Sequence, residues 1–213
     1  MRGLEFGQLR SILCLGAHSD DIEIGAGATI LKLVRENPQA KVVWVAFAAS
    51  GVRKQEAQAS AERFLEGAGA SKIVLNDFRD GHFPEQWAEL KAFTETLKVE
   101  EPDLVLTHYN RDLHQDHRIL SEVTWTTFRD HSILEYEIPK WDGDMGSPNF
   151  YVPATIADAD RKIALLMECF TSQSDKHWFD DLTFRGLMRL RGLECRAPEK
   201  LAEAFYARKL RLA

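Results

Sequence analysis

Short apolar runs alternate with helical patterns through the first half of the chain, and this alternation constrains the fold more than any other feature. The run Lys41–Ala48 is almost continuously apolar and rich in valine. A strand has this composition when both faces of its sheet are covered. Strands that alternate with helices form βαβ units and therefore a parallel sheet. The expected strands of this half are 11–15, 41–48, 71–75 and 103–107, and the expected helices are 24–34, 55–66, 87–97 and 119–128.

We therefore predict an α/β fold of the Rossmann-like type, a mostly parallel sheet with helices on both faces and a strand order near 3-2-1-4-5. The chain has 213 residues, of which 45% are hydrophobic, and no linker or repeat divides it. We expect a single domain over residues 1–213. The expected elements of the second half are strands at 133–138, 150–152 and 204–210 and helices at 158–170 and 183–190.

Charge and composition narrow the class of partner. The formal net charge is −6 and charges of both signs are interspersed, so the concentrated basic face of a nucleic-acid-binding protein is not expected. No run approaches the ~18 apolar residues of a membrane span, and the segment Met1–Gln8 lacks the apolar core of a signal peptide. We expect a soluble cytoplasmic protein with a small-molecule substrate and no membrane span. The sequence is compatible with a monomer or with a homo-oligomer.

Two polar clusters follow the first and fourth expected strands, at 17–21 and 107–117. Strands one and four are neighbours in the predicted order, and ligands bind where the winding direction reverses, outside the carboxyl ends of such strands. Each cluster alone could be an ordinary turn, because Asp and Ser are common turn and cap residues. Together they indicate one site. The candidate residues are His18, Asp20 and Asp21 in the first cluster and His114, Asp116 and His117 in the second.

The residue types in these clusters are those of a metal site. Two histidines and a carboxylate, with one position left for water, are the usual protein ligands of catalytic zinc. His18 and Asp21 are spaced by three, as are His114 and His117, so on a helical turn both members of a pair would point to one side. Not all four are needed as ligands. The remaining histidines have no such pattern around them and are expected on the surface or behind the site; they are His82, His108, His131 and His177.

The segments Ala17-His-Ser-Asp-Asp21 and His114-Gln-Asp-His117 together resemble the AHPDD and HxDH motifs of the LmbE-like, or PIG-L, family of zinc-dependent N-deacetylases. The chain departs from the family pattern at Ser19, where proline is usual, and at Ile22, where glutamate is common. Neither position supplies a ligand. Supporting similarities extend over nearly the whole chain, at 53–56, 79–81, 172–173, 185–186 and 202–205.

The resemblance implies that a zinc ion is bound by His18, Asp21 and His117. It also implies that Asp20 is the general base. Amide hydrolysis needs a nucleophile near neutral pH, and zinc can lower the pKa of its bound water to roughly 7. Family members act on N-acetylated amino sugars and glycoconjugates. We therefore expect a zinc-dependent amidohydrolase that removes an N-acetyl group from such a substrate.

Four further roles follow from the resemblance. His114 is expected to stabilise the oxyanion or to protonate the leaving amine, with Asp116 orienting it. Arg53 and Asp80 match family positions that contact substrate, although solvated loop charges are equally compatible with the sequence. Two other interpretations stay open at this point. One is a metal-dependent esterase or phosphoesterase that uses the same site, and the other is a non-catalytic protein that binds metal and sugar.

Overall fold

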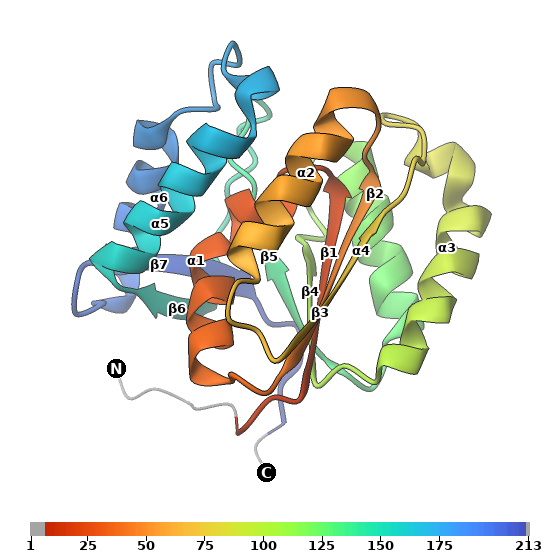
Figure 1. The fold of residues 1–213 in the computed structure, drawn as a ribbon, viewed down its shortest axis with the longest axis horizontal. Coiled ribbons are helices and arrows are strands. Elements are labelled where there is room, and N and C mark those ends of the chain that lie inside the picture. The colour runs from red at the N-terminus through yellow and green to blue at the C-terminus, as the bar shows by residue number, and fades with distance from the viewer. Residues whose placement is uncertain (1–6, 212–213) are drawn as a thin grey trace.

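The computed structural model describes residues 7–211, which form a seven-stranded sheet with helices on both faces (Figure 1). The strands are β1 (Ser11–His18), β2 (Lys41–Ala48), β3 (Ala70–Leu75), β4 (Leu104–His108), β5 (Ser132–Tyr136), β6 (Phe150–Ala154) and β7 (Leu201–Tyr206). The α-helices are α1 (Asp21–Glu36), α2 (Gly51–Phe64), α3 (Trp87–Thr96), α4 (Gln115–Thr127), α5 (Ile156–Cys169) and α6 (Asp181–Cys195). The 3-10 helices are η1 (Phe83–Gln86), η2 (Leu97–Glu100) and η3 (Thr171–Gln173). No helix within 7–211 is long and apolar enough to cross a bilayer, and most of the segment 1–8 lies outside the described residues.

The strand order is β3-β2-β1-β4-β5-β7-β6. β1 to β5 pair in parallel, which confirms the predicted 3-2-1-4-5 arrangement. β7 pairs antiparallel with both β5 and β6 and forms a mixed edge. The expected C-terminal strand exists, but it begins earlier than predicted, at Leu201, and ends at Tyr206.

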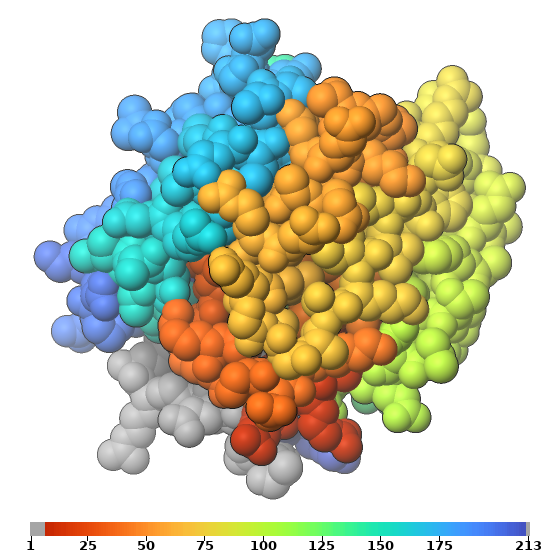
Figure 2. Space-filling model, viewed as in Figure 1, coloured from red at the N-terminus to blue at the C-terminus, as the bar shows by residue number. Residues whose placement is uncertain are grey.

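The core lies in two layers because the side chains of the central strands alternate between the faces of the sheet. Ile12 and Cys14 of β1 pack into the layer that holds apolar residues of α1, α2 and α5. Leu13 and Leu15 pack into the opposite layer, with α3 and α4. On the first face, α2 and α5 lie side by side (Figure 2). Both faces of β1 and β2 are therefore covered, as the apolar run of β2 predicted.

Three helices begin three or four residues earlier than the apolar periodicity predicted, α1 at Asp21, α2 at Gly51 and α4 at Gln115. Their first turns carry polar residues that face the site, so the apolar pattern does not mark them. The strand β1 also runs on to His18. His18 and Asp21 consequently do not share a helical turn, as their spacing had suggested, because one ends a strand and the other begins a helix.

The helix α1 passes very close to β5 at Gly25. A Cβ atom on Gly25 would lie 2.2 Å from the ring of Tyr136. This ring is buried and cannot easily move, since the Tyr136 hydroxyl donates a hydrogen bond to the carbonyl of Leu15 at 2.6 Å. Gly186 of α6 offers a comparison, because a Cβ atom there would meet no atom within 4 Å.

We expect Gly25→Ala to lower the free energy of unfolding by about 1–3 kcal/mol, since the added methyl overpacks the core against Tyr136. Gly186→Ala should raise it by about 0.5–1 kcal/mol, because a helical alanine loses less backbone freedom on folding. Urea unfolding of both variants and the wild type measures the two effects. A stabilising Gly25→Ala would show that α1 and Tyr136 can separate without cost.

Candidate metal centre

The two predicted clusters meet at the carboxyl edge of the sheet, the upper edge in Figure 1. β1 and β4 are adjacent and parallel, and they end in His18 and His108. Residues 19–20 connect β1 to α1, and residues 109–114 connect β4 to α4. The connection that follows β3 adds Asp80. The topology thus places these segments, which lie far apart in the chain, around one point.

Three of the predicted side chains have the spacing of metal ligands. His18 Nδ1 lies 3.2 Å from His117 Nε2 and 3.2 Å from Asp21 Oδ2. His117 Nε2 lies 3.5 Å from Asp21 Oδ1. Ligand atoms about 2.0–2.1 Å from a tetrahedral zinc ion are roughly 3.3–3.4 Å from one another. His18 approaches one oxygen of Asp21 and His117 approaches the other, so the two imidazoles and this carboxylate offer the donor types and spacing that zinc takes.

The outer nitrogens of both imidazoles face carboxylates. His117 Nδ1 lies 2.9 Å from Asp112 Oδ2. His18 Nε2 lies 3.3 Å from Asp116 Oδ2 and 3.1 Å from Asp80 Oδ1. Histidines that bind metals usually donate the other ring N–H to such a group, which fixes the tautomer and the ring orientation. When such a ring is neutral, its proton lies on the outer nitrogen and the inner nitrogen can bind a metal.

Asp116 contacts a different partner from the one predicted. Its carboxylate accepts hydrogen bonds from the backbone amides of Gly81 at 2.6 Å and Phe83 at 3.0 Å, in addition to its contact with His18. Gly81 has a φ of +79°, a conformation that favours glycine. Only the backbone amide of Asp116 meets His114, donating to its Nδ1 at 3.2 Å. Asp116 therefore orients His18 and the loop before η1, and its carboxylate is not the group that contacts His114.

Asp20, the predicted base, contacts Arg53, which in turn contacts Asp80. Arg53 Nη2 donates to Asp20 Oδ1 at 3.0 Å, and Arg53 Nη1 lies 3.6 Å from Asp80 Oδ2. Arg53 belongs to the first turn of α2, although the sequence predicted a loop there. Asp20 Oδ2 is buried and has no hydrogen-bond partner among the described residues. One oxygen of this carboxylate is thus held by Arg53, and the other is unpaired.

Two residues of the site were not singled out from the sequence. His108 is fully buried, its Nε2 lies 3.1 Å from Asp21 Oδ2, and its ring stacks on His117 with the centroids 3.9 Å apart. Asp112 is the partner of His117. Both lie inside the polar segment 107–117. The sequence signal for His108 was its position at the end of β4, which matches the position of His18 at the end of β1. Among the described residues, donor atoms come within 4.8 Å in the sets His18/His114/His117, Asp21/His108/His117 and His18/Asp80/Asp116.

Burial and neighbouring charges set the protonation of the ligand side chains. Burial, together with His108, lowers the pKa of His117 to about 3. Burial opposes the charge of Asp21, but His117, His108 and His18 outweigh it and hold the pKa of this carboxyl well below its usual range. A neutral imidazole and an ionised carboxylate are the forms that bind metals. For His18, the carboxylates of Asp21, Asp116 and Asp80 outweigh burial and raise the pKa of the imidazole, so the surroundings favour a positive charge.

Comparison with known proteins finds relatives in sequence and in fold. The chain is 28% identical to the uncharacterized deacetylase YaiS of Escherichia coli (strain K12) over 141 residues, which are 61% of this chain and 75% of YaiS. Its fold resembles that of N,N'-diacetylchitobiose deacetylase from Pyrococcus horikoshii, with a TM-score of 0.71 and 21% identity over 92% of this chain and 83% of the other. It also resembles GalB, the 4-carboxy-2-hydroxymuconate hydratase of Pseudomonas putida KT2440, with a TM-score of 0.71 and 17% identity over 96% of this chain and 98% of the other.

The family comparison covers the segment that carries both clusters. The model of the PIG-L family, described as GlcNAc-PI de-N-acetylase, matches residues 13–128. This match spans more than half of the chain and includes most of β1, all of β2 to β4, and the candidate ligands His18, Asp21 and His117. The chain therefore belongs to the PIG-L, or LmbE-like, family.

Proposed function

We propose that this protein is a zinc-dependent N-deacetylase that removes the acetyl group from an N-acetylated amino sugar or glycoconjugate. The observation that carries the proposal is the facing pair of His18 Nδ1 and His117 Nε2, 3.2 Å apart, each ring backed by a carboxylate. Family membership and the relatives that are named deacetylases support the reaction class. The fold alone would not, since GalB has a similar fold and is named a hydratase.

His18, Asp21 and His117 would hold the zinc ion. Zinc supplies a nucleophile near neutral pH, because it can lower the pKa of water to roughly 7. Asp20 accepts the proton of the attacking water. The Oδ2 atom of Asp20 has no hydrogen-bond partner among the described residues, and Arg53 fixes the orientation of the carboxylate by donating to Oδ1. Burial raises the pKa of Asp20 against the opposing charge of Arg53, which makes the carboxylate a better proton acceptor.

His114 stabilises the charge that develops on the carbonyl oxygen. Its Nδ1 accepts a hydrogen bond from the Asp116 amide, so in the neutral ring the proton sits on Nε2. Burial and the charge of His18 lower the pKa of His114, which keeps the ring neutral. Its ring lies against both ligand rings, with centroids 4.9 Å from His18 and 4.5 Å from His117. A neutral N–H at this position suits an oxyanion donor, and the proton for the leaving amine then comes from Asp20.

Asp80 and Arg53 contact the sugar in this proposal. The side chain of Asp80 is 58% exposed and that of Arg53 is 29% exposed, whereas the side chain of Asp20 is only 3% exposed. The two residues therefore lie between the buried base and solvent, where sugar hydroxyls would pass. Asp80 can accept hydrogen bonds from hydroxyl groups, and Arg53 can donate through nitrogens that Asp20 does not use.

The purified protein should carry about one zinc ion per chain, and His18→Ala, Asp21→Ala and His117→Ala should each lose it. His114→Ala should keep the ion, because His114 Nδ1 is already bonded to a backbone amide. Metal analysis after dialysis measures the content of each variant. Full zinc occupancy in all three ligand variants would contradict the assignment of these residues as ligands. Loss of zinc in His114→Ala with retention in His117→Ala would show that His114, and not His117, is the ligand.

Asp20→Asn should retain zinc while turnover falls by roughly 10²–10⁴-fold, the range for a lost general acid-base group. Asparagine keeps the shape of the side chain but cannot take up the proton. Asp130→Asn is the matched control, since this carboxylate is 91% exposed and lies in the turn before β5. Turnover near the wild-type value in Asp20→Asn would exclude this residue as the base.

A panel of N-acetylated sugars, nucleotide sugars and glycoconjugates tests the proposed reaction directly. We expect free amine and acetate in equal amounts from at least one class, and we expect this release to stop when zinc is chelated. Phosphate release from the nucleotide sugars without acetate would instead favour a phosphoesterase. Acetate release from O-acetyl esters alone would favour an esterase on the same site.

A further inference from the structure

Lys140 lies in the connection between β5 and β6, and its largely buried side chain lies behind the candidate metal centre. Only 9% of its side chain is exposed. Its ammonium lies 3.0 Å from Asp112 Oδ1 and 2.5 Å from Asp144 Oδ2. These three side chains line one small cavity beside the site. One cation thus joins two buried carboxylates, one of which is the partner of His117.

The same contacts join the β5–β6 connection to the loop that precedes α4. Asp112 Oδ2 meets His117 Nδ1 at 2.9 Å, and Asp112 Oδ1 accepts the backbone amide of His114 at 2.8 Å. Asp144 Oδ2 accepts the backbone amide of Leu113 at 2.7 Å. Lys140 therefore lies between a side chain that orients a metal ligand and a loop that lies at the edge of the site.

Removing the ammonium would leave two buried carboxylates without their cation. Uncompensated buried charge is costly, because the charges have lost their hydration and must regain water or a proton. Without the ammonium, we expect the Asp112 side chain to rotate toward solvent. This rotation would break its contact with His117. A metal ligand without its outer partner typically binds the ion 10–100-fold less tightly.

We propose that Lys140 is a positioning residue for the metal centre. It holds Asp112 in the orientation that fixes the ring of His117, and it makes this orientation depend on the placement of the β5–β6 connection. The inference rests on the proposed function only in naming zinc as the ion. A wild-type protein that binds no zinc would overturn both together, whereas the comparisons below can overturn the role of Lys140 alone.

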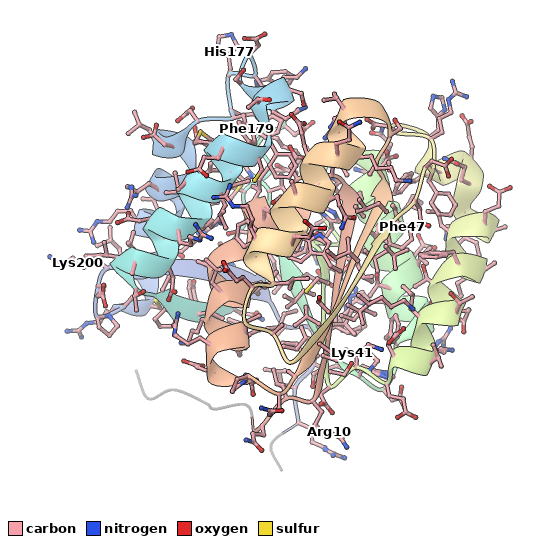
Figure 3. The ribbon with its side chains drawn as sticks, viewed as in Figure 1. Arg10, Lys41, Phe47, His177, Phe179 and Lys200 are labelled. Atoms are coloured by element: carbon pink, nitrogen blue, oxygen red, sulfur yellow. The ribbon has the colours of Figure 1, made fainter. Side chains whose placement is uncertain are left out.

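The first test is zinc affinity, measured by competition with a chelator and therefore independent of activity. Lys140→Met should bind zinc roughly 10–100-fold more weakly than the wild type. Lys140→Arg should restore most of the affinity, since it returns a cation that can meet both carboxylates. Lys41→Met is the matched control, because Lys41 also pairs with a buried carboxylate, Glu100, but lies at the opposite edge of the sheet (Figure 3). Wild-type affinity in Lys140→Met would overturn the proposal.

A double-mutant cycle decides whether Lys140 acts through Asp112. If it does, Lys140→Met should change zinc affinity less than about twofold in an Asp112→Asn background, because the partner it positions is already lost. Losses that multiply in the double variant would mean that Lys140 supports the site by another route, and would overturn the proposal. The same cycle is repeated with Lys140→Gln, which removes the charge but keeps a polar donor. The test can then be read from this variant if Lys140→Met fails to fold.

Discussion

The carboxylate behind each of the two facing imidazoles is the interaction on which the rest of the site depends. Asp112 and Asp116 fix the outer nitrogens of His117 and His18, and this leaves the inner nitrogens 3.2 Å apart beside Asp21. Three buried carboxylates around two imidazoles form an anionic pocket that favours a divalent cation. Neighbouring parallel strands make the arrangement possible, because β1 and β4 end at the same edge of a rigid sheet.

The outer carboxylates also organise the surrounding loops. Asp116 holds the amides of Gly81 and Phe83, so the connection carrying Asp80 is tied to the first turn of α4. Asp112 holds the turn before α4 and, through Lys140, the β5–β6 connection. These three connections are therefore each bonded to a side chain that contacts a candidate metal ligand. Ligand geometry and the shape of the mouth are consequently coupled.

The sequence predicted the fold well where one pattern repeats and less well where it does not. Four alternations of an apolar run with a helical pattern predict five neighbouring parallel strands, whereas the short edge strands β6 and β7 carry little pattern of their own. In the site, strand adjacency was enough to bring His18 and His117 together. His108 was not singled out, because one histidine at a strand end has no spacing partner. The contact of Asp116 with His18 spans 98 residues, and local spacing suggested a nearer partner in His114.

The charges of the site bear on the reactions that the sequence left open. A phosphoesterase needs cations to meet a phosphate group, but Arg53 and Lys140, which contact residues of this site, each already pair with two carboxylates. Arg53 donates to Asp20, and Lys140 lies between Asp112 and Asp144. An incoming phosphate would add negative charge to a pocket already rich in carboxylates, whereas the acetyl amide of a sugar adds none. The roles proposed for the unpaired oxygen of Asp20 and the Nε2–H of His114 likewise favour catalysis over the non-catalytic binding of metal and sugar. In the proposed mechanism they are a proton acceptor and an oxyanion donor, the groups that hydrolysis of an uncharged acyl bond requires.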